Sequence, residues 1–191
     1  MNKKTLSLTK NQYQQIVAAA RSGISTNEII FKPNERLATV LILQANIGLR
    51  ISDILNLKLS DIVHDGERYR LDIVEQKTKK SRTFTIIPAI YQFLIEYAAK
   101  NDLGFNTKLF DVSERAIQKQ LKIICDYLNF DGISTHSFRK FYATQIYENN
   151  NCDIELVRVL LQHSNSTITQ RYIGISPLKI EQALQNHNMI I

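Results

Sequence analysis

The sequence predicts a mainly α-helical (α+β) domain with one small antiparallel sheet of two or three strands. Over most of the 191 residues, apolar side chains recur at helical spacing. Between Ile62 and Ile87 the spacing changes to an alternation of apolar and polar residues, which is typical of half-buried strands. A chain of this length that is 44% hydrophobic can bury a single core, so one domain over residues 9–191 is expected.

The N-terminal region predicts a tail followed by two helices. Residues 1–8 are expected to form a tail or linker. Thr9 is a suitable N-cap for a helix that continues to about Arg21. A second helix is expected to begin near Pro33, because proline suits a first helical turn, and to continue to Asn46. Its apolar residues cover more than one face, which predicts a helix in the core.

The middle of the chain predicts the sheet. Asp65-Gly66 is a turn signal between two strands. The alternating apolar residues are Tyr69, Leu71, Ile73, Phe84 and Ile86. Between these two groups lies Q-K-T-K-K-S-R, residues 76–82, which predicts a basic hairpin tip.

The second half of the chain predicts a series of helices with capping residues at their starts. They are expected to begin at or near Pro88, Ser113, His136, Asp153 and Ser166, and a last amphipathic helix is expected over residues 177–187. That last helix is a candidate either for packing on a neighbouring protomer or for packing on its own domain.

Charge and cysteine content limit the class of protein. The net charge of +6, with a pI of about 9.3, suggests a polyanionic partner without proving one. Cys125 and Cys152 lack metal-ligand spacing, so both are expected to be reduced thiols in a reducing compartment. The N-terminus lacks the apolar stretch of a secretory signal, and no apolar run reaches the length of a membrane span. A cytoplasmic location with no membrane association is therefore expected.

Two pairs of residues in the last third of the chain suggest phosphoryl chemistry. His136 and Arg139, in H-S-F-R, lie on one face of a helix, where an imidazole and a guanidinium can reach one phosphate. His163 and Tyr172 follow, nine residues apart, and a tyrosine whose proton is removed can act as a covalent nucleophile. Each pair alone also has an ordinary explanation, as a solvated helix face or as core and surface residues.

Two upstream cationic positions could complete such a site. Arg50 follows the helix break at Gly48, in G-L-R-I-S-D-I, and could bind an anion or simply pair with Asp53. We expect Asp53 to orient Arg50 or a neighbouring group. Lys77 lies in the basic hairpin tip, where a lysine could protonate a leaving oxygen. The hairpin cations could equally protect a sheet edge.

Taken together, these motifs resemble the catalytic domain of the tyrosine recombinases, the phage integrase family. The family pattern is an arginine in G-L-R-x-x-[ED]-L, a lysine in a β-hairpin, H-x-x-R, a histidine or tryptophan in L-G-H, and a tyrosine about nine residues later. The corresponding residues here are Arg50, Lys77, His136, Arg139, His163 and Tyr172. The resemblance covers roughly residues 7–185 and includes Thr169, where the family often has a threonine.

The chain departs from the family pattern at several positions. Lys140 stands where a histidine often follows the motif arginine, Gln162 replaces the glycine of L-G-H, and Gly174 replaces a histidine after the tyrosine. Family members usually carry an N-terminal core-binding domain of about one ordinary domain length. This chain starts where the catalytic domain starts, so either an excised domain or a short family member is expected.

The resemblance implies transesterification of double-stranded DNA without metal or other cofactor. Tyr172 would attack a phosphodiester and form a 3′-phosphotyrosyl link, while Arg50 and Arg139 clamp the phosphate and His163 donates a hydrogen bond. His136 would be the general base and Lys77 the general acid, although Lys79 or Lys80 could replace Lys77. The DNA-binding set implied here comprises Lys79, Lys80, Arg82 and Lys140. The expected assembly is a homotetramer on DNA and a monomer when free in solution.

Two alternatives remain open at this point. A type IB topoisomerase-like nicking and closing enzyme would share the same six residues. A non-catalytic DNA-binding module derived from a recombinase would keep only the basic surface. The presence of all six catalytic residue types argues against the second alternative.

Overall fold

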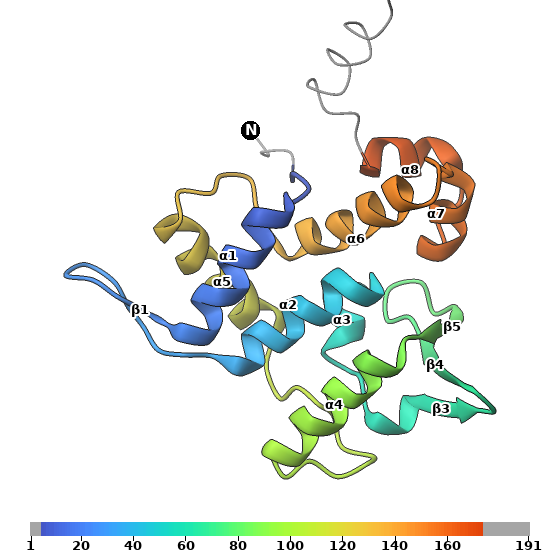
Figure 1. Cartoon of the computed structure of the whole chain (residues 1–191), viewed down its shortest axis with the longest axis horizontal. Coiled ribbons are helices and arrows are strands. Elements are labelled where there is room, and N and C mark those ends of the chain that lie inside the picture. The colour runs from blue at the N-terminus through green and yellow to red at the C-terminus, as the bar shows by residue number, and fades with distance from the viewer. Residues whose placement is uncertain (1–4, 174–191) are drawn as a thin grey trace, which may run out of the picture. The chain divides into compact units, whose positions relative to one another are not determined.

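The computed structural model describes residues 5–173 (Figure 1). These residues divide into two compact units, one ending at Tyr142 and the other beginning at Ala143, which are described separately below. The expected helix over residues 177–187 lies outside the described residues. The mainly helical fold with a small antiparallel sheet is confirmed, whereas the single domain over residues 9–191 stays a prediction.

The N-terminal unit begins with two helices joined by a hairpin that the sequence did not predict. Helix α1, Lys10–Ser22, starts at Thr9, whose side chain forms a reciprocal capping box with Gln12. The two-residue strands β1, Ile24–Ser25, and β2, Ile30–Phe31, then pair antiparallel. Figure 1 shows this hairpin extending away from α1 and from helix α2, Glu35–Ile47.

Helix α2 is the central element of the core, as its many apolar residues predict. It contacts α1, the short helix α3, Ile51–Ile54, and helix α5, Glu114–Tyr127. Its fully buried side chains include Leu37 and Leu41. Because α2 also ends one residue before Gly48, the core fixes the position of the loop that leads to Arg50.

The sheet contains three antiparallel strands in the order β3-β4-β5, with bounds Ile62–Asp65, Arg68–Val74 and Ser81–Ile86. A short 3-10 helix, Leu59–Asp61, precedes it. Helix α4, Pro88–Lys100, packs on β4, and the rings of Tyr69 and Tyr91 stack with centroids 4.2 Å apart. The packing presents the loop between β4 and β5 at one end of the sheet.

Residues 5–8, which were expected to belong to a tail or linker, pack on the N-terminal unit. Leu8 is 5% exposed and belongs to the core. The backbone N–H of Leu6 donates to the carbonyl of Gly132, and Lys140 Nζ donates to the carbonyl of Thr5. These contacts fasten the segment to the start of helix α6, Thr135–Asn149.

The C-terminal unit contains the end of α6 and two short helices, α7, Ile154–Leu161, and α8, Ser166–Ile173, which pack on each other. Asp153 caps α7, as predicted. For α8 the cap is one residue earlier than predicted, because the side chain of Asn165 accepts from the N–H of Ile168. Of the helices between residues 5 and 173, none has the length and apolar character needed to cross a bilayer.

Candidate active site

Arg50 is held by a buried carboxylate that the sequence did not single out. Its Nη1 donates to Oε2 of Glu75 at 2.5 Å. Glu75 is fully buried, at 0% exposure, whereas the Arg50 side chain remains 22% exposed. Arg82 also pairs with Glu75, Nη1 to Oε1 at 3.4 Å. The guanidinium of Arg50 is thus fixed from the protein side and open on another side.

The loop between β4 and β5 carries Lys77 and is braced from two directions. The hydroxyl of Thr78 donates to Glu75 Oε2 at 2.7 Å, and the backbone N–H of Lys79 donates to the carbonyl of Glu75. Asp53 Oδ1 accepts from the N–H of Gln76 at 2.8 Å. Asp53 therefore orients the loop that carries Lys77, which is a group close to Arg50. Arg50 itself pairs with Glu75.

Arg139 is anchored on the loop that precedes Arg50. Its Nη1 donates to the carbonyl of Gly48 at 2.6 Å. Gly48 ends α2 in the left-handed conformation, with φ of 63°, and a Cβ there would come within 2.2 Å of the Tyr142 ring. Only glycine fits this contact. Arg139 is 1% exposed, so a ligand reaches its guanidinium only when the side chains that cover it move.

His136 is surrounded by cations. Partial burial of its imidazole, together with the positive charges of Arg139, Lys140, Arg50 and Lys77, lowers its pKa to about 4. Because the side chain of His136 as a whole is exposed to solvent, the four positive charges are a stronger reason for the lowered pKa than burial is. At neutral pH the imidazole is uncharged and able to accept a proton.

A cavity of about 740 Å³ in the N-terminal unit brings three of the predicted residues together. Arg50, Lys77 and His136 all line it. Part of its lining comes from α5, including Gln118 and Lys122. Carboxylates of Glu114, Asp126 and Asp131 also line the cavity, so only the part next to Arg50 and Lys77 is suited to an anion.

The C-terminal unit holds the other two predicted residues. The rings of His163 and Tyr172 meet edge to face, with centroids 5.0 Å apart. Nδ1 of His163 lies 3.0 Å from Oγ1 of Thr169, which is fully buried. This hydrogen bond fixes the ring and directs Nε2 away from Thr169. Nη1 of Arg158 also donates to the carbonyl of His163, which holds the backbone.

Gln162 keeps the backbone shape that its position requires. It ends α7 in the left-handed conformation, with φ of 54°, where glycine has the lowest strain. The departure from the L-G-H pattern therefore leaves the turn into His163 intact.

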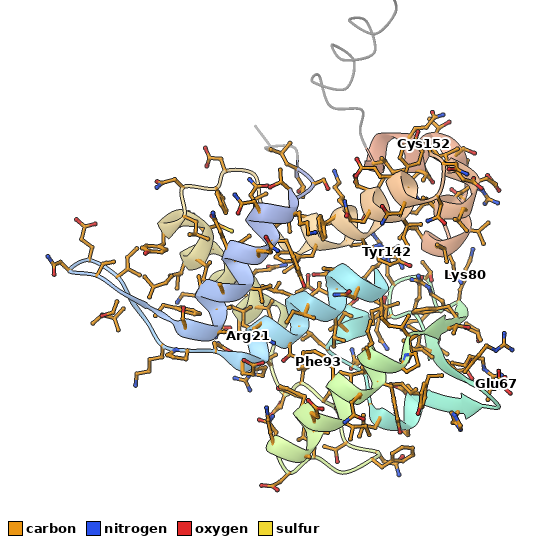
Figure 2. The ribbon with its side chains drawn as sticks, viewed as in Figure 1. Arg21, Glu67, Lys80, Phe93, Tyr142 and Cys152 are labelled. Atoms are coloured by element: carbon orange, nitrogen blue, oxygen red, sulfur yellow. The ribbon has the colours of Figure 1, made fainter. Side chains whose placement is uncertain are left out.

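The implied DNA-binding residues differ in their exposure. Lys79 and Lys80 are exposed on the β4–β5 loop, and Figure 2 shows Lys80 at the opposite end of the sheet from Glu67. Arg82 is 3% exposed, which places it in the interior and not on a DNA-facing surface. Lys140 is half-buried and bonded to Thr5, so its contact with DNA stays a prediction.

Glu75 and Arg82 were the functional candidates that sequence reasoning missed or misplaced. The alternation of β5 contained a signal for Arg82, because it shares a face with Phe84 and Ile86. No local signal marked Glu75, whose partner Arg50 lies 25 residues away.

Several known proteins resemble this chain in sequence. Residues 7–177 match the model of the phage integrase family. The chain is 32% identical over 170 residues to "Probable integrase/recombinase YoeC" of Bacillus subtilis, covering 84% of this chain and 91% of that protein. It is 28% identical over 164 residues to "Tyrosine recombinase XerC" of Caldanaerobacter subterraneus, covering 80% of this chain and 45% of the relative.

Solved structures share the fold. The XerH site-specific recombinase bound to its difH substrate superposes with a TM-score of 0.69 at 19% identity, over 97% of this chain and 54% of that one. The catalytic domain of bacteriophage HP1 integrase gives a TM-score of 0.63 at 18% identity, over 97% of both chains. The chain thus spans nearly all of some relatives and about half of others.

Proposed function

The chain belongs to the phage integrase family, the tyrosine recombinases, and on that premise we propose that it cuts and rejoins double-stranded DNA through a covalent link to Tyr172. The proposed activity is that of a site-specific recombinase or integrase catalytic domain. It is expected to act as a homotetramer when assembled on DNA.

The observation that carries the proposal is the concentration of positive charge around His136. Arg50 and Lys77 line the same cavity as His136, and the charges of Arg139 and Lys140 act with theirs to lower the pKa of the imidazole. Glu75 neutralises only Arg50 among these four cations, so the remaining positive charge next to a neutral base favours a bound anion. A phosphodiester supplies that anion.

The proposed reaction proceeds in one displacement. His136 takes the phenolic proton of Tyr172, and the phenolate oxygen forms a bond to phosphorus. The bond between phosphorus and the 5′ oxygen breaks, and Lys77 donates a proton to that oxygen. Arg50 and Arg139 stabilise the charge on the non-bridging oxygens, and His163 donates a further hydrogen bond. The reverse displacement by another 5′ hydroxyl rejoins the strand.

Affinity for DNA is proposed to come largely from phosphate contacts of Lys79 and Lys80. Both are exposed on the β4–β5 loop. Binding through such contacts weakens steeply as salt rises, and each lost phosphate contact lowers the slope by about 1. Substituting either lysine by alanine should therefore reduce both affinity and its salt dependence.

Covalent trapping tests the proposal. The protein is incubated with a library of nicked half-site duplexes from which the cleaved 5′ end diffuses away, and adducts that resist SDS are sequenced. Tyr172→Phe should abolish the adducts. Tyr127→Phe, at a tyrosine on α5 that is 41% exposed, should leave them unchanged.

The other outcomes separate the alternatives. Adducts that persist in Tyr172→Phe would refute the assignment of the nucleophile. Salt-sensitive DNA binding with no adduct in the wild-type protein would favour a non-catalytic DNA-binding module. Relaxation of supercoiled DNA without joining of two sites would favour a topoisomerase-like activity.

A further inference from the structure

We propose that Glu75 is a positioning residue that presents Arg50 and the loop of Lys77 to the scissile phosphate as one unit. The proposal rests on the proposed function for its catalytic consequence. Its structural basis is that one carboxylate bonds both partners, with Oε2 accepting from Arg50 Nη1 at 2.5 Å and from the Thr78 hydroxyl at 2.7 Å.

The backbone of Glu75 strengthens this connection. Its N–H donates to the carbonyl of Lys80, and its carbonyl accepts from the N–H of Lys79, so both bonds close the loop that contains Lys77. The side chain and the backbone of a single residue therefore set the position of the loop relative to Arg50.

The charge of Glu75 is maintained although the residue is buried. Burial alone would raise its pKa, but hydrogen bonds from Thr78 and Arg50 and the charges of Arg50 and Arg82 outweigh burial and lower it. The carboxylate is therefore ionised at neutral pH and fixes one guanidinium nitrogen of Arg50. A planar guanidinium has further nitrogens with which to hold a phosphate oxygen.

This arrangement predicts that Glu75→Gln changes DNA binding and DNA cleavage differently. Glu75→Gln keeps the shape of the side chain but removes a negative charge next to the anion site. DNA should then bind as tightly as before or more tightly, because one repulsive charge is gone. Cleavage should slow by about tenfold, because Arg50 is no longer held for the transition state.

The matched control is Glu67→Gln, which removes the same charge from an exposed position at the far end of the same sheet (Figure 2). It should leave the rate constant for cleavage unchanged. In the Arg50→Ala background, Glu75→Gln should cause a smaller loss of cleavage than in the wild type, because only the bond to the Lys77 loop is left to remove. Multiplicative losses would overturn the proposal.

A second readout does not depend on cleavage. In the wild-type protein labelled with ¹⁵N-arginine, the guanidinium signals of Arg50, identified by Arg50→Lys, should show restricted rotation. Glu75→Gln should release that restriction, while Glu67→Gln should not. Unchanged Arg50 signals in Glu75→Gln would overturn the inference, whether or not the protein cuts DNA. Faster rotation of the Arg50 guanidinium in Glu75→Gln, together with no covalent adduct in the wild-type protein, would support the positioning role but contradict the proposed function.

Thr78→Val serves as a milder variant in case Glu75→Gln does not fold. It removes only the bond between the loop and the carboxylate. Cleavage should slow, and a substrate with sulfur in place of the bridging 5′ oxygen should restore the rate, because a thiolate leaves without a proton from Lys77. Failure of that substrate to restore Thr78→Val would contradict the link between Glu75 and the Lys77 loop.

Discussion

The carbonyl of Gly48 accepts a hydrogen bond from Nη1 of Arg139 at 2.6 Å, across 91 residues of sequence. The bond joins the end of α2 to the start of α6, and Arg50 lies two residues beyond the same glycine. Both arginines therefore depend on the conformation of one short loop.

Substituting Gly48 by alanine should destabilise the protein more than an ordinary glycine substitution does. The φ of 63° strains any side chain, and the added Cβ would meet the Tyr142 ring at 2.2 Å. Gly66 has the same φ of 63° with nothing within 4 Å, so Gly66→Ala is the matched control. We expect Gly48→Ala to lose about 1–3 kcal/mol more than the control in urea unfolding. Equal losses would show that the Tyr142 contact is easily relieved.

The pH dependence of the free energy of unfolding should reveal the lowered pKa of His136. Its pKa is about 4 in the folded protein against 6.5 when unperturbed. Between these values the unfolded state binds more protons, so the free energy of unfolding should fall as the pH drops from about 6.5 to 4. His136→Gln should lessen this fall. Parallel pH profiles for wild type and His136→Gln would contradict the shift.

The rate of DNA cleavage should also fall when His136 becomes protonated at acid pH. A general base acts in its neutral form, so the acid limb of the pH–rate profile for cleavage should lie near the His136 pKa of about 4, well below 6.5. An acid limb near 6.5 would mean either that the cations do not surround His136 during the reaction or that another group is the base.

Thr169 should matter to cleavage through His163. Thr169→Val is nearly the same size but removes the hydroxyl that lies 3.0 Å from His163 Nδ1. The free energy of unfolding should fall by about 1 kcal/mol, and cleavage should slow because the ring is no longer fixed. Thr167→Val changes an exposed threonine on the same helix and serves as control. A normal cleavage rate in Thr169→Val would remove Thr169 from the site.

The N-terminal segment should contribute to stability at Leu8 but not at Leu6. Leu8 is 5% exposed and Leu6 is 52% exposed. Leu8→Ala should cost about 2–5 kcal/mol, as truncation of a core leucine does. Leu6→Ala should change the free energy of unfolding by less than about 0.5 kcal/mol. Similar small effects of both substitutions would show that residues 5–8 behave as a tail and do not contribute to stability.

Short-range signals in the sequence predicted much of the fold. The caps at Thr9, Ser113 and Asp153 were found because a capping side chain bonds a backbone N–H only a few residues away. The hairpin of β1 and β2 was missed because two-residue strands are too short for an alternation to register.

Long-range interactions explain what the sequence could not predict. The basic character of residues 76–82 suggested an exposed loop, yet Arg82 is buried because Glu75 neutralises its charge in the interior. Asp53, three residues away, was one possible partner for Arg50, but the fold brings Glu75 to Arg50 across 25 residues. Such pairings become visible only when the strands are placed.

The two cysteines differ in exposure, so one of them can carry a fluorescent label. Cys125 is buried on α5 and its pKa is raised to about 11, mainly by burial, so it stays a protonated thiol near neutral pH. Cys152 is exposed in the C-terminal unit (Figure 2). A maleimide dye should therefore label the native protein at one position without mutagenesis. Its fluorescence would follow the unit that carries Tyr172 while DNA is added.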